Sequence, residues 1–288
     1  MGEMVSQVMI VNLIDRNIAH VKSYDDGLEK GRASKKIVYV RNQQDFQGIT
    51  VFTDECLKAV DQIRSRFKVA WLMEPRAYSP QVYKTLIDLI DRFHLVLTYD
   101  SQLLYHYPNV CARVPASGIF LDSNSIFTQA SKSKICSMIY SNKKILPGHR
   151  LRHEVVHYIA SKGFEVELFG TGTGSYLERK SQSLNDYCFS ISIENSVDDF
   201  YITEKIYDCF AARTVPIYWG SNTVLDDFNP TGILKFNTLD ELDDILSSLS
   251  YDLYDMKRKA IEENYHLALK HYSVDDHIAD ILSKSFKQ

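Results

Sequence analysis

The stretch from Cys188 to Gly220 constrains the fold more than any other part of the chain. Its sequence, CFSISIENSVDDFYITEKIYDCFAARTVPIYWG, predicts an apolar strand over 188–193, a polar corner, a helix over 201–213 and a second strand over 215–219. Ile202, Ile206 and Phe210 recur at the spacing of one helical face, which we expect to be buried. A helix between two strands is typical of a βαβ unit, so the sheet should be parallel.

The polar residues at the corner of this unit are not explained by packing. They are Glu194, Asn195, Tyr201, Glu204 and Lys205. Lys205 falls in the first turn of the expected helix, where the helix dipole disfavours a cation. An anion in the same site would make this lysine favourable, because the free N–H groups of helix N-termini bind phosphates. The corner therefore predicts a site for a phosphate-bearing ligand, and Asp198 and Asp199 are expected to cap the helix.

The rest of the chain alternates short apolar runs with amphipathic runs, which indicates two α/β domains with mostly parallel sheets. Helices are expected over 53–67, 79–93, 148–161, 176–185, 239–249, 251–272 and 274–284. Further strands are expected over 8–13, 36–40, 49–52, 69–73, 95–98, 110–114, 135–140, 164–169 and 233–236.

A polar segment over 116–134 is the best candidate for a domain boundary. We therefore expect an N-terminal α/β domain over 1–130 that binds an acceptor and a second α/β domain over 131–265 that binds a nucleotide donor. A C-terminal helix over 266–288 could pack back on the first domain.

Composition limits the kinds of partner. The formal net charge is −4, which argues against nucleic acid or an anionic membrane as the main ligand, so any phosphate site must be built locally. The five cysteines are scattered and form no CxxC pair, so neither a structural zinc site nor a disulfide framework is expected. The N-terminal apolar run in MGEMVSQVMIVNLIDRN is too short for a membrane span, so we expect neither a signal peptide nor an anchor, and no stable membrane insertion.

The pattern ENS…YITEK…VPIYWG resembles the donor-binding signature of the glycosyltransferase family 10 fucosyltransferases. These enzymes use GDP-fucose to make α1,3- or α1,4-linked fucose. The resemblance implies a GT-B fold, in which two Rossmann-like domains face a cleft, and an inverting transfer of fucose from GDP-fucose to a glycan hydroxyl. Eukaryotic members carry an N-terminal membrane helix, and no such helix stands in this sequence, so a bacterial or viral cytoplasmic enzyme, or a trimmed piece of a longer protein, is expected.

The resemblance also implies roles for the corner residues. Lys205 would bind the diphosphate, Glu204 would accept hydrogen bonds from the ribose, and Asn195 and Tyr201 would line the nucleotide. Glu194 could join them or could instead be structural, holding the polar corner through backbone N–H groups. No DxD motif ends an apolar strand, so we expect protein cations, and no metal cofactor, at the diphosphate.

Glu74 follows the strand expected over 69–73, and open α/β sheets bind ligands at the C-terminal ends of their strands. The family has a carboxylate here that is regarded as the general base, in a segment ending ESP or EN·SP. The segment WLMEPRAYSP departs from this pattern, because Pro75 directly follows the glutamate and Ser79 comes later. A solvated carboxylate at a strand end is the alternative.

Arg150 and Arg152 stand near the start of the helix expected over 148–161, and guanidinium groups suit a diphosphate. The resemblance implies one functional arginine at this helix start. Arg152 fits the register better and Arg150 is the second candidate, whereas a solvent-facing pair is the alternative.

The same helix contains a competing motif. His153-Glu154-Val155-Val156-His157 is HExxH, the pattern of zinc metalloproteases, but the metzincin continuation fails and a third ligand such as Glu178 has no support. His149, His153 and His157 lie off the apolar side and are expected to face solvent.

Two further alternatives are a same-fold glycosyltransferase that uses another nucleotide sugar and a non-catalytic sugar-nucleotide-binding module. The glycine-rich segment FGTGTGS over 169–175 lacks the GK[ST] ending of a P-loop and is expected to be a flexible loop beside the donor site.

Overall fold

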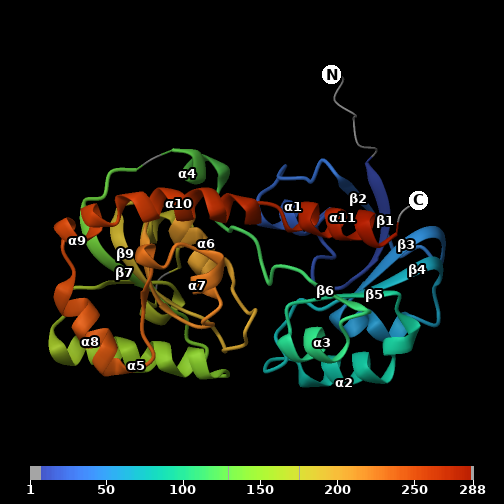
Figure 1. Cartoon of the computed structure of the whole chain (residues 1–288), viewed down its shortest axis with the longest axis horizontal. Helices are drawn as coiled ribbons and strands as arrows, with labels where there is room; N and C mark the ends of the chain where they lie inside the picture. The colour runs from blue at the N-terminus through green and yellow to red at the C-terminus, as the bar shows by residue number, and fades with distance from the viewer. Residues whose placement is uncertain (1–7, 129, 175, 287–288) are drawn as a thin grey trace. The chain divides into compact units, whose positions relative to one another are not determined.

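The chain folds into two compact units, each with its own parallel sheet. The computed structural model describes residues 8–128, 130–174 and 176–286. Unit 1 comprises the chain up to Ala116 together with the residues from Ser273 onward, and unit 2 runs from Ser117 to Tyr272 (Figure 1). The divisions therefore fall at 116 and 272, where the sequence placed them at 130 and 265. The expectation about the N-terminal segment concerns residues 1–17, of which 1–7 lie outside the described ranges, and the apolar run after them forms strand β1 (Met9–Ile14).

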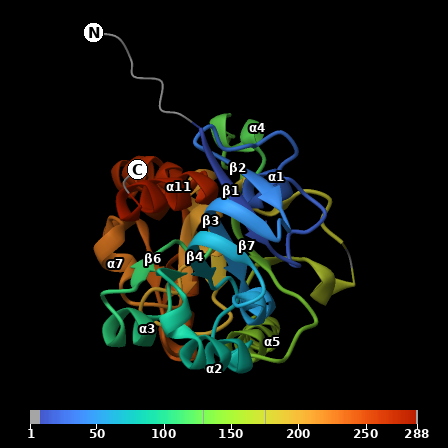
Figure 2. The ribbon, with the colours of Figure 1, turned by 90° about the vertical axis from the view of Figure 1, so that its right-hand side faces the viewer.

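The sheet of unit 1 has six parallel strands in the order β2-β1-β3-β4-β5-β6. Figure 2 shows the first four side by side. The strands are β1 (Met9–Ile14), β2 (Ile37–Arg41), β3 (Asp45–Thr53), β4 (Arg64–Trp71), β5 (Leu95–Thr98) and β6 (Cys111–Arg113). The helices are α1 (Tyr24–Leu28), α2 (Pro80–Asp88), α3 (Ser101–His106) and α11 (Val274–Ser285), with 3-10 turns η1 (Asp54–Ala59) and η2 (Ile90–Arg92).

Both faces of this sheet are covered. On one face, strand residues such as Val51 and Trp71 pack against Ile278 and Leu282 of α11. On the other face, residues such as Phe52 pack with Leu86 of α2. The C-terminal helix therefore completes the core of unit 1, although the whole of unit 2 precedes it in the sequence.

The helix expected over 53–67 is wrong. The structure has only the short turn η1 there, and β4 begins at Arg64. The reason is the alternation of Phe67, Val69 and Trp71, which buries one side of a strand paired with β3. The helix expected over 79–93 is confirmed in part, because α2 ends at Asp88 and η2 follows.

The sheet of unit 2 has five parallel strands in the order β11-β10-β9-β7-β8. They are β7 (Lys134–Ile139), β8 (Glu167–Phe169), β9 (Tyr187–Ile193), β10 (Val215–Trp219) and β11 (Leu234–Lys235). The helices are α4 (Ser123–Phe127), α5 (Pro147–Lys162), α6 (Glu204–Ala211), α7 (Val224–Asp227), α8 (Leu239–Ser248), α9 (Tyr251–Met256) and α10 (Arg258–Ala268). Short 3-10 turns are η3 (Thr171–Thr173), η4 (Lys180–Ser183), η5 (Pro230–Gly232) and η6 (Leu269–His271).

The central strand β9 is buried along its whole length, as its apolar run predicts. Val155 of α5 and Leu242 of α8 pack in one core with β9 residues such as Phe189. Ile206 and Phe210 of α6 pack with α10 in the other core, which confirms the buried helical face. The helix expected over 176–185 is wrong, because only η4 forms and the Ser183 hydroxyl bonds locally to the Lys180 carbonyl.

No helix within the described ranges is long and apolar enough to cross a membrane. The five cysteines are free thiols, and all but the half-buried Cys111 are buried.

Candidate functional site

A cavity of about 290 Å³ lies at the C-terminal edge of the unit 2 sheet. Open parallel sheets bind their ligands at this edge. The ends of β7 and β9, the loop after β8, the segment around η4 and the helices α5 and α6 all contribute to the lining. Its charged lining residues are Arg152, Lys180, Glu204 and Lys205. Three cations and one carboxylate thus face a cavity whose remaining wall is mostly apolar, formed by residues such as Ile139 and Leu177.

The start of α6 is held by a buried carboxylate. Glu194 is fully buried, and its two oxygens accept hydrogen bonds from the Thr203 backbone N (2.9 Å) and hydroxyl (2.7 Å). Thr203 is the N-cap of α6, and its side chain accepts from the Lys205 backbone N. Asp198 and Asp199 therefore do not cap this helix as expected, because α6 begins later than the sequence pattern suggested. The contacts of Glu194 are those of a residue that fixes the corner.

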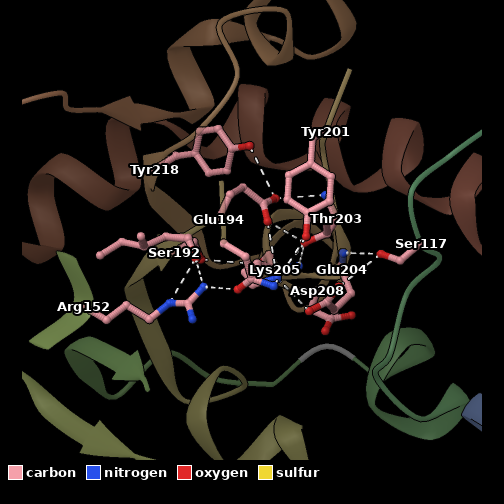
Figure 3. Close-up of polar contacts among 12 residues, drawn as sticks. Ser117, Arg152, Ser192, Glu194, Tyr201, Thr203, Glu204, Lys205, Asp208 and Tyr218 are labelled. Carbon is pink, nitrogen blue, oxygen red and sulfur yellow. Dashed lines mark hydrogen bonds and ion pairs between the residues drawn. The ribbon is translucent and has the colours of Figure 1, made fainter. Parts of the chain in front are cut away.

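Lys205 lies in the first turn of α6, as predicted, and its ammonium is surrounded by oxygen atoms. Nζ is 2.9 Å from the Thr203 hydroxyl, 3.1 Å from Glu204 and 3.3 Å from Glu194 (Figure 3). Burial alone would lower the pKa of Lys205, but the charges of Glu204 and Glu194 outweigh it and raise the pKa. Lys205 is therefore a cation at neutral pH.

Glu204 lines the cavity next to Lys205. Burial works to raise its pKa, but the positive charges of Lys205 and Lys180, with hydrogen bonds from Lys205 and Ser117, lower it to about 2. The Ser117 hydroxyl donates to one carboxylate oxygen at 3.1 Å and accepts from the Glu204 backbone N. Glu204 therefore presents a fixed, ionised acceptor, which suits a ligand hydroxyl.

Arg152 is buried and reaches the cavity from the second turn of α5, because that helix begins at Pro147. Its guanidinium donates to the Ile193 carbonyl at the end of β9 (Nε, 3.1 Å) and to the Asn195 side-chain oxygen (Nη2, 2.8 Å). Burial lowers the pKa of Arg152, while the charges of Glu194 and Glu204 oppose that shift. These hydrogen-bond acceptors are neutral, so the guanidinium retains positive charge for an anionic ligand.

The other predicted donor residues lie outside the cavity lining. Arg150 is exposed and donates to the carbonyls of Lys144 (3.2 Å) and Ile145 (2.9 Å). Asn195 supports Arg152, and its amide is 3.4 Å from the Tyr201 hydroxyl. The structure therefore brings Arg152, Glu204 and Lys205 together at the cavity, whereas its lining does not include Arg150, Glu194, Asn195 or Tyr201.

Lys180 is a cavity residue that the sequence reasoning missed. Its ammonium lies 2.5 Å from Asp208 of α6, which is fully buried and also accepts from the backbone N of Phe120 and Leu121. Burial raises the pKa of Asp208, and the charge of Lys180 counteracts that shift. The sequence held one signal for a further cation here: the i, i+4 spacing of Glu204 and Asp208 places two carboxylates on one face of α6, and such a pair favours a nearby positive charge.

Gly148 allows α5 to approach the end of β9 closely. A Cβ atom there would lie 1.7 Å from the Glu194 carbonyl oxygen, so no larger residue fits without a shift. The Gly148 backbone N donates to the Asn195 carbonyl at 2.9 Å. This contact sets the distance from which Arg152 reaches Ile193.

The histidines of α5 differ from the expectation. His149 is buried, and its Nδ1 accepts from the Leu146 backbone N (3.1 Å). Burial, with the charges of Arg152, Lys143 and Lys205, lowers its pKa to about 4. The prediction that it faces solvent is wrong because α5 packs against β9. His153 is half-buried with its ring edge-on to Tyr140, and His157 is exposed. The described residues include no group of three His, Cys, Asp or Glu side chains that could hold a metal ion.

Two further predictions concern the loops. In the glycine-rich segment, Gly170 and Thr171 line the cavity, and Ser175 lies outside the described residues. Glu74 belongs to unit 1, where it stands three residues after the end of β4 at Trp71. Its side chain is exposed and its carbonyl accepts from the Tyr83 hydroxyl at 2.8 Å.

Two α/β units, each with a parallel sheet and one with a cationic cavity at its sheet edge, are the architecture of the GT-B fold. Solved structures with this fold include an α1,3-fucosyltransferase with GDP-fucose, which is 16% identical, has a TM-score of 0.60 and is matched over 97% of this chain and 93% of that one. Anabaena Alr3699/HepE in complex with UDP-glucose is 10% identical, with a TM-score of 0.60 over 96% of this chain and 100% of that one. These likenesses show the fold.

The family follows from the sequence comparisons. The profile of glycosyltransferase family 10 (fucosyltransferase), C-terminal part, matches residues 129–280, which is more than half of the chain, and the chain belongs to this family. The Helicobacter pylori "Alpha-(1,3)-fucosyltransferase FucT" is 35% identical over 78 residues, 27% of this chain and 16% of that protein. The human "4-galactosyl-N-acetylglucosaminide 3-alpha-L-fucosyltransferase 9" is 31% identical over 160 residues, 53% of this chain and 40% of that protein. The chain thus matches less than half the length of these curated relatives.

Proposed function

We propose that this chain is a fucosyltransferase that binds GDP-fucose in the unit 2 cavity and transfers the fucose to a glycan hydroxyl. The observation that carries the proposal is the charge arrangement of the cavity. Arg152, which is buried, and Lys205, which is half-buried, are cations beside Glu204, an ionised acceptor, and this combination suits a diphosphate next to a ribose. Family membership supports fucose as the sugar, and one structure with the same fold is described as a complex with GDP-fucose.

In this mechanism the cations act on the leaving group. As the bond between the fucose C1 and the β-phosphate oxygen breaks, negative charge grows on the phosphate. Arg152 and Lys205 stabilise that charge more in the transition state than in the ground state, which lowers the barrier. Because protein cations supply this charge, transfer should proceed without an added divalent ion. Transfer measured after dialysis against EDTA tests this, and loss of activity restored by Mg²⁺ or Mn²⁺ would contradict it.

Glu74 is the proposed general base. It would take the proton from the acceptor hydroxyl as that oxygen attacks C1, and GDP would leave from the opposite side. A single displacement inverts the configuration, so β-linked fucose in the donor becomes an α-fucoside in the product. Its place just after β4, at the C-terminal edge of the unit 1 sheet, supports this assignment, whereas its segment departs from the family pattern at Pro75 and Ser79.

Two experiments test the proposal. Calorimetric titration with GDP, UDP, GDP-fucose and GDP-mannose identifies the donor, and tighter binding of UDP than GDP would favour another nucleotide sugar. Incubation with GDP-fucose and a panel of glycans containing N-acetyllactosamine, followed by NMR of the product, reports the anomeric configuration and the α1,3 or α1,4 linkage. A β-fucoside product would refute the inverting step. Donor hydrolysis with no transfer to any acceptor would contradict a transferase.

A further inference from the structure

A buried carboxylate in unit 1 holds the segment that carries Glu74. Asp54 directly follows β3 and is 5% exposed. One of its oxygens accepts from the Met73 backbone N at 2.9 Å, and the Glu74 backbone N–H also bonds to this carboxylate. The other oxygen accepts from the Asn17 amide at 2.8 Å. Asp54 therefore joins the loops that follow β1, β3 and β4 at the C-terminal edge of the sheet.

Two tyrosines hold the same segment from its carbonyl side. The Tyr99 hydroxyl donates to the Met73 carbonyl at 3.0 Å, and the Tyr83 hydroxyl donates to the Glu74 carbonyl at 2.8 Å. Both rings are buried. The backbone of Met73 and Glu74 is thus bonded through its N–H groups and its carbonyls, while the Glu74 side chain is exposed. This arrangement fixes the origin of the side chain and leaves its carboxylate accessible.

Asp54 adopts a conformation that needs an explanation. Its φ is +32°, in the region that residues other than glycine rarely adopt. Such conformations persist where the surrounding structure holds them, and they concentrate at functional sites. In this conformation the Asp54 carboxylate accepts from the backbone N–H groups at the end of the next strand, those of Met73 and Glu74.

The electrostatics couple Asp54 to Glu74. Burial raises the pKa of Asp54 to about 6, the Met73 N–H opposes that shift and the charge of Glu74 adds to it. Other charged groups at this edge include Asp15, which accepts from the Thr53 hydroxyl, and Arg41, which is 3.3 Å from Asp15. Arg76, two residues after Glu74, is paired with Asp100 at 2.7 Å. At neutral pH Asp54 is therefore mostly ionised, and it is a negative neighbour of Glu74.

We propose that Asp54 is a positioning residue for the transfer reaction, which holds the backbone of Glu74 so that its carboxylate is presented in one orientation. The proposal rests on the role of Glu74 as general base. Asp54 acts through backbone hydrogen bonds and does not itself contact the substrate.

The test compares Asp54→Ala and Asp54→Asn with the unaltered chain in a fucosyl-transfer assay. Asp54→Ala should lower kcat about tenfold to a hundredfold, because misplacing a catalytic group by about 1 Å costs rate on this scale. Asp54→Asn should restore part of that loss, since its amide oxygen can still accept from Met73. The Kd for GDP should not change in either variant, because Arg152, Glu204 and Lys205 are untouched.

A pH profile separates positioning from a merely structural role. Asp54→Asn removes a negative charge beside Glu74, which makes ionisation of Glu74 easier, so the acid limb of kcat should move to lower pH. The matched control is Asp25→Asn, another buried carboxylate of unit 1, which accepts from the Val274 backbone N at 3.1 Å. It should leave kcat and the acid limb unchanged.

The outcomes distinguish this inference from the proposed function. If Glu74→Gln abolishes transfer while both Asp54 variants keep the kcat and acid limb of the unaltered chain, the role of Glu74 as general base is supported and the positioning role of Asp54 is refuted. If Glu74→Gln retains near-normal transfer, the base role fails and the positioning role fails with it. If Asp25→Asn lowers kcat as much as Asp54→Asn, the effect is general destabilisation and the inference is overturned. Should Asp54→Ala fail to fold, Asp54→Asn alone decides the question.

Discussion

Replacing Arg152 with alanine is the most informative single change in the unit 2 cavity. The substitution removes a buried guanidinium whose hydrogen bonds go to the Ile193 carbonyl and the Asn195 side-chain oxygen. If Arg152 stabilises the charge on the departing phosphate, its loss should lower kcat about a hundredfold to a thousandfold. This corresponds to roughly 3–4 kcal/mol of transition-state stabilisation at about 1.4 kcal/mol per factor of ten.

The same substitution should lower the free energy of unfolding by less than it lowers transition-state stabilisation. Hydrogen bonds from a charged donor contribute about 1.5–3 kcal/mol each, but water entering the cavity can replace part of what Ile193 and Asn195 lose. A cooperative unfolding transition should therefore remain, with the midpoint lowered. Arg152→Lys should give an intermediate kcat, because the ammonium keeps the charge and loses the planar fork.

The assay is transfer of labelled fucose from GDP-fucose, with GDP binding followed calorimetrically at several salt concentrations. Arg150→Ala is the matched control, since Arg150 lies on the same helix but is exposed and bonded to the carbonyls of Lys144 and Ile145. It should transfer at a near-normal rate. The reasoning is refuted if Arg152→Ala keeps near-normal kcat, or if Arg150→Ala loses as much as Arg152→Ala.

Three further predictions follow from the same geometry. Lys180→Met should raise the KM for the donor several-fold with little change in kcat, because Lys180 supports the ionised Glu204, and an unchanged KM would argue against this role. Gly148→Ala should lower the midpoint of thermal unfolding and raise the Kd for GDP, because the added Cβ would lie 1.7 Å from the Glu194 carbonyl oxygen. An unchanged Kd for GDP would contradict the importance of this close approach. The pKa of Asp25 is raised from 3.8 to about 7, chiefly by burial and then by the charge of Asp275. The folded state then holds a proton that the unfolded chain releases, so the free energy of unfolding should fall as pH rises from about 4 to 7. Urea unfolding at several pH values should show this slope and its reduction in Asp25→Asn, and identical slopes in the two proteins would refute the assignment.

Much of the fold could be predicted because strands and helices are set by local patterns. The run from 188 to 193 is apolar at 188, 189, 191 and 193, and it lies within the buried strand β9. Phe67 shows why the prediction failed over 53–67, since it continues the alternation of Val69 and Trp71 into β4, the strand that pairs with β3. Helical and extended patterns overlap in such mixed segments, and only the pairing partner decides between them.

The candidate site was predicted where its residues lie close together in sequence. Glu204 and Lys205 stand in the first turn of a helix, so their spacing placed them at one helix end. His149 could not be assigned correctly, because its burial depends on the packing of α5 against β9, which Gly148 permits.

The sequence by itself determined the family and the βαβ unit from 188 to 219, and it placed the cations Arg152 and Lys205 near two helix starts, because these features depend on motifs and on local spacing. The tertiary structure decided which of these residues meet at one cavity and what holds them. Ser117 bonds to Glu204 across 87 positions of sequence, and Met73 bonds to Asp54 across 19. Contacts of this kind form only when separate strands end at the same edge of a sheet, and no local pattern records them.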